Sequence, residues 1–595
     1  MTGRGPVLLL ISIFCALAGA PAAADADPPP VSVRTLHFDT VVGPNDDTHC
    51  DVVGDLYSPA SASPTSPAPA VLTTNGFGGS KDDQRAMATA LAERGYIVLA
   101  YSGLGFGGSG CKIELDDPDW DGKAGSQLIS FLGGTKAATD GTVLDDVRLD
   151  GPGDPRVGMI GGSYGGQIQY AVAGQDPRVD TIIPIITWND LAYSLTPNNT
   201  DLMTGVTSST VGVAKYQWAS LFTTIGVADG LDGLRYDPNR VVGTCPNFDD
   251  RVCPGVIEAG ITGAPSDTTL GMLRHASVAS YIDHIKIPTL LLQGQADTLF
   301  NLNESVATYE ALRAQGTPVK LVWQSWGHSG STPAPGELGK TDGGYAPDDA
   351  SGLTYEGRVV EQWFDHYLKD APQAPRLDFS YFRDWVPYTG GADPAYGHAG
   401  AYPAGRPQTL LLSGTDTLTT QRSAVQPGTA QFVTPPAGAP TSVTEISGVG
   451  PDVPLFDAPG TFAQYTSAPL PRDTDVVGVP RATLRLSLPG ADAAGVLSPA
   501  LRPTLFVKLE DVAPDGSVTL PHRLIAPIRP SRVDRPVDVA LPGIVHRFAA
   551  GHRLRLVVAA GDAAYRGAAL PGPVAITTDP VQPGSLRVPV VAGGA

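Results

Sequence analysis

The pattern of apolar and polar positions changes near residue 375. Before this point, short apolar runs typical of buried strands alternate with longer stretches whose apolar residues recur at helical spacing. The strand-like runs are 31–42, 51–58, 69–76, 96–102, 156–163, 179–188, 287–294 and 319–326, and the helix-like stretches are 82–95, 121–134, 303–316 and 357–369. The alternation predicts an α/β domain over 31–375, with a mostly parallel sheet covered by helices on both faces.

Two regions depart from this alternation. Residues 190–285 contain mixed helical stretches without strong strands, which predicts a helical cap inserted into the sheet domain. Caps of this kind shape a substrate pocket and exclude water from it. Residues 376–595 consist of short strand-like runs separated by turns rich in Gly and Pro, such as 376–385, 408–414, 504–512 and 552–561. This pattern of short strands and turns predicts an all-β sandwich or jelly-roll domain.

The first residues have the pattern of a secretory signal peptide. Arg4 precedes an apolar core at 7–20, and Ala22–Ala24 offers a cleavage site, so we expect 1–24 to be removed. The mature protein is expected to be secreted, either extracellular or associated with the cell wall. The formal net charge of −20 argues against nucleic acids and anionic membranes as partners.

The cysteines predict disulfides. Cys15 lies in the expected signal peptide, and the other four are Cys50, Cys111, Cys245 and Cys253. An even number in an exported protein favours two disulfides, and Cys245 and Cys253 would close a short loop. Because the chain has no Cys-x-x-Cys motif and no cluster of histidines, we expect no metal site.

The stretch "RVGMIGGSYGGQIQYAVAG" at 156–174 carries the first candidate for chemistry. An apolar run precedes Ser163, glycines surround it, and a potential helix follows. This order matches the G-x-S-x-G nucleophile elbow, a sharp strand-to-helix turn that exposes the serine hydroxyl. The alternative is a structural turn in which the serine is merely small; the strand–turn–helix context favours a nucleophile.

A serine nucleophile needs a base and an orienting acid, which follow it in the order acid then histidine in α/β-hydrolases. Asp297 follows the strand-like run 287–294, and His328 follows the run 319–326. We therefore predict Asp297 as the acid and His328 as the base. The alternative for Asp297 is a capping carboxylate, and Asp190, after the run 179–188, is the rival acid.

An oxyanion hole requires two hydrogen-bond donors. We predict the backbone N–H of Tyr164, directly after the serine, and that of Phe77 in "TTNGFGGSK", which resembles the His-Gly-x-Gly loop of lipases and esterases with Asn75 in place of the histidine. The glycines of "SGLGFGGSG" at 102–110 have the spacing of a dinucleotide fingerprint. However, a poor helix start follows them, so no nucleotide cofactor is expected.

The arrangement of an α/β-hydrolase sheet also pairs the remaining cysteines. The second strand of that fold runs antiparallel to its neighbour, the fourth strand. Cys50 precedes the expected second strand and Cys111 lies beyond the end of the fourth. These strand ends should be adjacent, which predicts a Cys50–Cys111 disulfide.

Several stretches together resemble the X-prolyl dipeptidyl-peptidase and cocaine esterase family of serine hydrolases. They are "RVGMIGGSYGG", "GQADTLF", "SWGHSG", "FVKLEDVAPDGSV" and "HRFAAGHRLRLVVAAG". The resemblance implies an α/β-hydrolase domain with a C-terminal jelly roll, and Ser163, Asp297 and His328 as nucleophile, acid and base. Members of the family usually have an oxyanion-hole tyrosine after a proline, whereas this chain has "TTNGFGG" in that region. This difference weakens the transfer of dipeptidyl-peptidase activity.

We therefore expect a secreted serine hydrolase that cleaves an amide or ester through an acyl-enzyme without a cofactor. X-prolyl dipeptidyl-peptidase activity on short peptides is the first hypothesis, with Asp190 and Asp201 as candidates for binding the substrate's amino group. An esterase of the cocaine esterase type, with a pocket lined by Trp188 and Tyr164, is the second. A non-catalytic binding protein on a hydrolase scaffold is the third, and a complete, correctly ordered triad argues against it.

Overall fold

A computed structural model describes residues 31–329, 332–338, 354–373, 375, 377–436, 455–567 and 570–591. The expected signal peptide at 1–24 lies outside the described residues. None of the helices in these ranges combines the length and apolar character needed to cross a bilayer.

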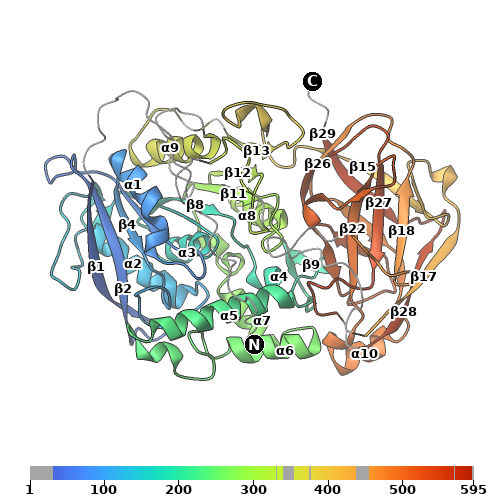
Figure 1. Ribbon diagram of the computed structural model, residues 1–595, viewed down its shortest axis with the longest axis horizontal. Helices are drawn as coiled ribbons and strands as arrows, with labels where there is room; N and C mark the ends of the chain where they lie inside the picture. The colour runs from blue at the N-terminus through green and yellow to red at the C-terminus, as the bar shows by residue number, and fades with distance from the viewer. Residues whose placement is uncertain are drawn as a thin grey trace, which may run out of the picture.

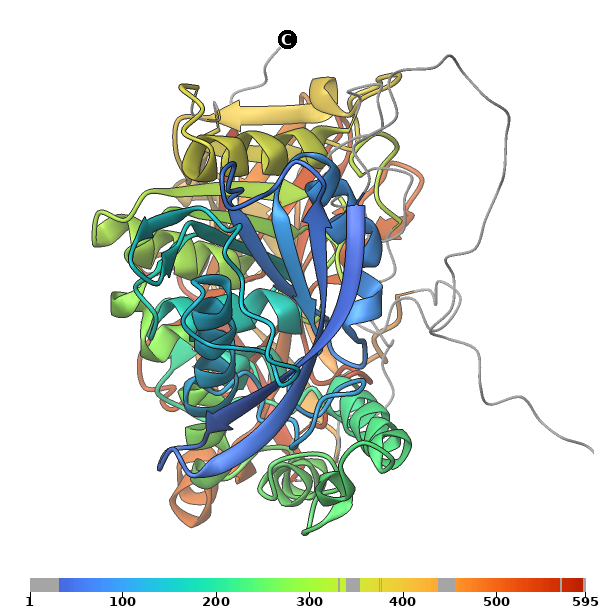
Figure 2. The same cartoon turned by 90° about the vertical axis from the view of Figure 1, so that its left-hand side faces the viewer.

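The first domain is built on a ten-stranded sheet with the order β1-β2-β4-β3-β7-β8-β11-β12-β13-β14. Its strands are β1 (Val31–Val42), β2 (Thr48–Pro59), β3 (Ala70–Thr74), β4 (Ile97–Tyr101), β7 (Val157–Gly162), β8 (Val179–Ile185), β11 (Thr289–Gly294), β12 (Val319–Gln324), β13 (Phe379–Phe382) and β14 (Tyr396–Ala399). The strands from β4 to β13 run parallel, and β1, β2 and β14 add antiparallel edges. Figure 2 shows the sheet from its β1 edge, with the strands fanned by their twist.

Helices cover both faces of this sheet, which accounts for its almost continuously apolar central strands. Successive β4 residues belong to different cores, with Leu99 in one and Val98 in the other, because side chains alternate across a strand. The covering helices are α1 (Arg85–Glu93) and α9 (Tyr355–Leu368) on one face, and α2 (Lys123–Leu132), α3 (Tyr164–Ala173) and α8 (Leu302–Ala314) on the other. The predicted α/β fold is confirmed.

The expected helical insertion lies between β8 and β11. It contains α4 (Leu191–Leu195), α5 (Tyr216–Gly233), α6 (Val252–Thr262) and α7 (Asp267–His275). Figure 1 shows α5 and α6 along the lower side of the molecule, outside both sheets. Buried Arg240, in the loop between α5 and α6, donates to the carbonyl oxygens of Gly105 and Gly107. The insertion is therefore attached to the glycine-rich loop after β4.

The C-terminal region is β-rich, as predicted. Its strands form a twelve-stranded sheet and a three-stranded sheet (β17-β28-β21) around a separate apolar core. The strands are β15 (Arg406–Ser413), β16 (Thr417–Thr419), β17 (Gly428–Thr434), β18 (Phe462–Ser467), β19 (Thr474–Gly478), β20 (Arg481–Leu484), β21 (Leu486–Ser487), β22 (Leu505–Val512), β23 (Val518–Thr519), β24 (Ala526–Ile528), β25 (Val537–Ala540), β26 (Ile544–Phe548), β27 (Arg553–Ala559), β28 (Gly572–Thr578) and β29 (Ser585–Val591).

One predicted boundary differs from the structure. The segment 376–385 was assigned to the β-rich domain, but β13 lies within it and pairs parallel with β12 of the first sheet. A short apolar run predicts a strand, but it does not indicate which of the two sheets contains that strand. The α9 crossover, which returns the chain beside β12, is what places this strand in the first domain.

Both predicted disulfides are present. Cys50 bonds to Cys111 with their Cα atoms 5.6 Å apart, and Cys245 bonds to Cys253 with a Cα separation of 5.3 Å. Cys50 lies within β2, which is antiparallel to β4 as expected. The first disulfide therefore ties β2, which lies next to the edge strand β1, to the loop after β4.

Candidate active site

Ser163 lies on the sharp turn between β7 and α3. Its φ of +57° is unusual for a residue with a side chain, and its N–H donates to Ile185 O at 2.8 Å. The neighbouring glycines are required by close backbone contacts: a Cβ on Gly161 would lie 2.6 Å from Gly165 O, and one on Gly165 would lie 2.5 Å from Thr74 O. The local sequence thus produces a strained turn that presents the serine hydroxyl.

The structure brings Ser163, His328 and Asp297 together from three separate loops. His328 Nε2 lies 2.8 Å from Ser163 Oγ, and His328 Nδ1 lies 2.6 Å from Asp297 Oδ2. Asp297 follows β11 and His328 follows β12, so parallel neighbouring strands deliver them to the same edge of the sheet. This chain of contacts is the geometry in which an imidazole accepts a proton from a serine hydroxyl.

Asp297 is held firmly in this arrangement. It is fully buried, and its Oδ1 accepts the N–H groups of Leu299 at 3.0 Å and Phe300 at 2.8 Å. The Phe300 ring meets the His328 ring edge-on, with centroids 5.0 Å apart. A Cβ on Gly327 would lie 2.7 Å from Asp297 Cβ, so this glycine allows the histidine loop to pass close to the carboxylate.

The two predicted oxyanion donors flank Ser163. Tyr164 is the first residue of α3, and a first-turn N–H has no acceptor within its own helix. On the other side, a Cβ on Gly76 would lie 3.8 Å from Ser163 Cβ, which puts the Gly76–Phe77 peptide beside the serine. The Phe77 and Tyr164 rings also pack together, with centroids 5.9 Å apart.

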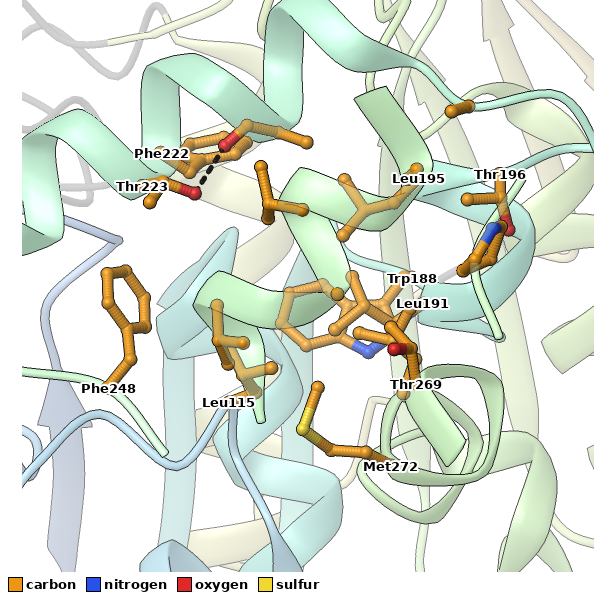
Figure 3. A pocket seen from close by; sticks show the side chains of 18 of the residues that line it. Leu115, Trp188, Leu191, Leu195, Thr196, Phe222, Thr223, Phe248, Thr269 and Met272 are labelled. Atoms are coloured by element: carbon orange, nitrogen blue, oxygen red, sulfur yellow. Dashed lines mark hydrogen bonds between the residues drawn. The ribbon is translucent and has the colours of Figure 1, made fainter. Parts of the chain in front are cut away.

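An apolar cavity opens from Ser163 beneath the cap. The described residues that line it are all uncharged. They come from the turn at Ser163, from the loops that carry Phe77 and Leu115, and from α4 to α7. Figure 3 shows Trp188, Leu191, Leu195, Phe222, Phe248 and Met272 around it. Trp188 and Tyr164 line the cavity as predicted.

Asp190 and Asp201 do not line this cavity. Asp190 caps α4, because its Oδ1 accepts the N–H of Ala192 at 3.0 Å and its Oδ2 accepts the Thr207 hydroxyl at 2.6 Å. Asp201 accepts the N–H of Ser531, from the β-rich domain, at 2.7 Å. Contrary to the prediction, Asp190 lies outside the cavity at Ser163, and both carboxylates have hydrogen-bond partners within the protein; binding of a substrate amine by either of them stays a prediction.

One further polar cluster could hold a cation. The ligand atoms of Asp117, Asp119 and His275 lie within 4.8 Å of one another. His275 Nε2 is 3.4 Å from a carboxylate oxygen of each aspartate, which is also the arrangement of an ion pair with a protonated imidazole. The cluster is separate from the contacts of Ser163.

Two buried glutamates support the loop that carries His328, and no sequence motif marks them. Glu337 accepts hydrogen bonds from the N–H groups of Ser325 at 3.0 Å and Ala334 at 2.8 Å, and from the Tyr396 hydroxyl at 2.7 Å. Glu356, on α9, accepts Trp326 Nε1–H at 3.1 Å. Burial, and secondarily the neighbouring Glu337 carboxylate, raises the pKa of Glu356 well above its usual range.

This raised pKa predicts a pH-dependent stability. The folded protein holds a proton that the unfolded chain releases above an ordinary pKa of about 4.3, so the free energy of unfolding falls as the pH rises from there toward the raised pKa. For each pKa unit by which the pKa of Glu356 in the folded protein exceeds that in the unfolded chain, the free energy of unfolding at high pH falls by about 1.4 kcal/mol. Glu356→Gln should therefore raise Tm at pH 8–9 by about 1–2 °C for each pKa unit, and much less at pH 4.

Thermal unfolding of both proteins across this pH range checks the prediction. Glu361→Gln is the matched control, because Glu361 lies on the same helix and pairs with Arg94 at 3.2 Å nearer the surface. A Tm difference between wild type and Glu356→Gln that does not change with pH would show that Glu356 is already ionised in the folded protein.

The fold and site define an enzyme class, the α/β-hydrolases. Residues 48–220 and 262–330 match the family model for X-Pro dipeptidyl-peptidase (S15 family), and residues 385–574 match the model for the C-terminal non-catalytic domain of X-Pro dipeptidyl-peptidases. The chain belongs to this S15 family of serine hydrolases, which hydrolyse ester or amide bonds.

Solved structures share the fold over almost the whole chain. An α-amino acid ester hydrolase, labelled with selenomethionine, is 18% identical with a TM-score of 0.64, and the match covers 96% of this chain and 98% of that chain. An aminopeptidase from a marine sediment archaeon, Thaumarchaeota archaeon, is 14% identical with a TM-score of 0.61, covering 97% and 99%. A CocE/NonD family hydrolase from Staphylococcus aureus is 13% identical with a TM-score of 0.58, covering 96% and 99%. Comparison with curated protein sequences finds no match.

Proposed function

We propose that Ser163 is the nucleophile of a serine hydrolase, with His328 as its base and Asp297 as the orienting acid. The observation that carries the proposal is the continuous contact from Ser163 Oγ through His328 to the buried Asp297 carboxylate, with distances of 2.8 and 2.6 Å. Asp297 would hold the imidazole with its proton on Nδ1, leaving Nε2 free to accept the serine proton.

The reaction would proceed in two halves. Ser163 Oγ attacks the substrate carbonyl carbon while its proton passes to His328 Nε2, and the N–H groups of Tyr164 and Phe77 stabilise the oxyanion. The carbonyl re-forms as the leaving alcohol or amine departs with the proton from His328. Water then attacks the acyl-enzyme while His328 takes its proton, and His328 passes that proton to Ser163 Oγ as the acyl–oxygen bond breaks, which releases the carboxylic acid and restores the free serine.

The cavity favours an ester with an uncharged apolar acyl group. An X-prolyl peptidase must hold a protonated amino terminus, and transferring an ammonium group into an apolar site without a partner is strongly unfavourable. The described lining offers no carboxylate for such a partner. X-prolyl dipeptidyl-peptidase activity is the second candidate, favoured by the family model that the catalytic region matches.

We also place the enzyme outside the cytoplasm. Its two disulfides support this location, because disulfides persist in oxidising compartments. The apolar stretch at 7–20 of the sequence is the expected export signal.

Parallel assays with p-nitrophenyl butyrate and Ala-Pro-p-nitroanilide test the substrate class. We expect ester turnover, with kcat/KM for the amide lower by about 100-fold or more because of the unpaired ammonium. Equal or faster amide turnover would favour the X-prolyl peptidase. If the folded protein cleaves neither substrate, the binding-protein hypothesis replaces the enzyme.

A further inference from the structure

Most of the exposed face of α5 is uncharged. It runs through Leu221, Thr224, Ala228 and Leu231, at the spacing of one helical face, and Leu221 and Leu231 are 42% and 58% exposed. The two acidic residues of α5 lie in its second half: Asp229 is half-buried, and Asp232 is exposed one turn after Ala228. A surface helix normally presents charged or polar residues on this side.

The exposed face of α6 is also mostly apolar, with the partly buried Glu258 at its border. Pro254, Ile257 and Ile261 form it, and the two isoleucines are 62% and 67% exposed. The two helices are neighbours, since a Cβ on Gly260 of α6 would lie 2.5 Å from the Tyr216 ring at the start of α5. Both helices lie along the lower side of the molecule, outside both sheets (Figure 1).

The opposite faces of the same helices line the cavity at Ser163. Ala219 and Phe222 of α5, and Val252, Val256 and Ala259 of α6, are among its lining residues. Each helix is therefore apolar toward the cavity and mostly apolar toward solvent. Contiguous exposed apolar surface of this kind marks an interaction site.

We propose that these outer faces of α5 and α6 form a docking surface for aggregated, uncharged esters, such as a droplet of the enzyme's own poorly soluble substrate. The inference rests on the proposed function, because an apolar acyl pocket selects molecules that aggregate in water. A neutral aggregate fits better than an anionic membrane, because the chain carries a formal net charge of −20 and the apolar faces contain no cation.

Binding without turnover provides the first test. The full chain with Ser163→Ala is mixed with a tributyrin emulsion, and the protein that partitions to the droplets is measured after centrifugation. Partition is expected, and Ile257→Asp with Ile261→Asp in the same background should weaken it by roughly 10-fold or more. Val143→Asp, at a loop valine that is 53% exposed, is the matched control and should partition like the parent.

Kinetics in the active background provide the second test. The rate with tributyrin should rise abruptly above its solubility limit in wild type, and the rise should be lost in the double variant. Turnover of soluble p-nitrophenyl acetate should stay within about 2-fold, because the outer faces do not touch the cavity. If the double variant unfolds early in a thermal melt, Leu231→Gln on α5 replaces it.

Several outcomes would overturn the proposal. They are no partition, equal partition of the parent and the double variant, or stronger binding to phosphatidylglycerol vesicles than to the neutral emulsion. A dimer that the double variant dissociates, without partition, would assign the surface to a second copy of the chain. Because partition uses the Ser163→Ala protein, absence of esterase activity would contradict the proposed function without deciding this test.

Discussion

Ser163→Ala should lower kcat/KM for the preferred ester by about 10⁵-fold or more while leaving the fold unchanged. Removing the nucleophile of a serine triad abolishes the acyl-enzyme route, and the remaining groups supply only a small part of the rate enhancement. Both serine and alanine carry a Cβ, so the strained backbone at φ +57° is equally unfavourable for either residue. The measurement is steady-state hydrolysis of p-nitrophenyl butyrate, together with thermal unfolding.

Thr223→Ala is the matched control for this substitution. Thr223 also lines the cavity and also carries a hydroxyl, but that hydroxyl donates to Ala219 O at 2.7 Å within α5. Its removal should change kcat/KM by only a few-fold. Activity in Ser163→Ala above about 1% of wild type would mean that another group is the nucleophile.

Asp297→Asn should lower kcat by about 10⁴-fold. In the wild type, Asp297 accepts three hydrogen bonds, from the N–H groups of Leu299 and Phe300 and from His328 Nδ1. An asparagine whose oxygen keeps the backbone donors turns its NH₂ group toward Nδ1. The imidazole must then accept at Nδ1 and carry its proton on Nε2, where it can no longer accept the proton of Ser163.

Asp190→Asn tests the rival acid in the same assay. Because Asp190 caps α4, its replacement should affect stability by about 1 kcal/mol or less and leave most of the activity. The assignment of the acid would be reversed if Asp190→Asn abolished activity and Asp297→Asn did not. A smaller loss in Asp297→Asn at higher pH would not reverse it, because the wrong tautomer persists there.

Much of the site follows from short-range sequence signals. The glycines around Ser163 reflect backbone contacts that only a sharp turn creates, so a local motif was sufficient to locate the serine. Asp297 and His328 each follow a readable apolar strand, and parallel strands bring their carboxyl ends to one edge. The Cys50–Cys111 disulfide could be predicted because the direction of β2 relative to β4 is a property of the fold.

Only the tertiary structure shows which carboxylates lie near the active site and which have other hydrogen-bond partners. Asp190 and Asp201 follow the strand β8 in sequence and looked available, but their carboxylates are occupied by a helix terminus and by the other domain. Glu337 and Glu356 support the His328 loop from positions with no recognisable motif. These carboxylates and most of their hydrogen-bond donors lie far apart in the sequence, so no local sequence pattern could predict the pairs.

Strand order and surface exposure were decided in the same way. The sequence by itself determined that 379–382 forms a strand, because an apolar run favours that conformation wherever it packs. Only packing placed it beside β12, since α9 returns the chain to that edge. Likewise, the sequence predicts a helical cap over 190–285, but only the structure shows that α5 and α6 each expose one face to solvent. Helix and strand formation depends on neighbouring residues, but burial depends on which distant surfaces meet, and that is settled only when the whole chain has folded.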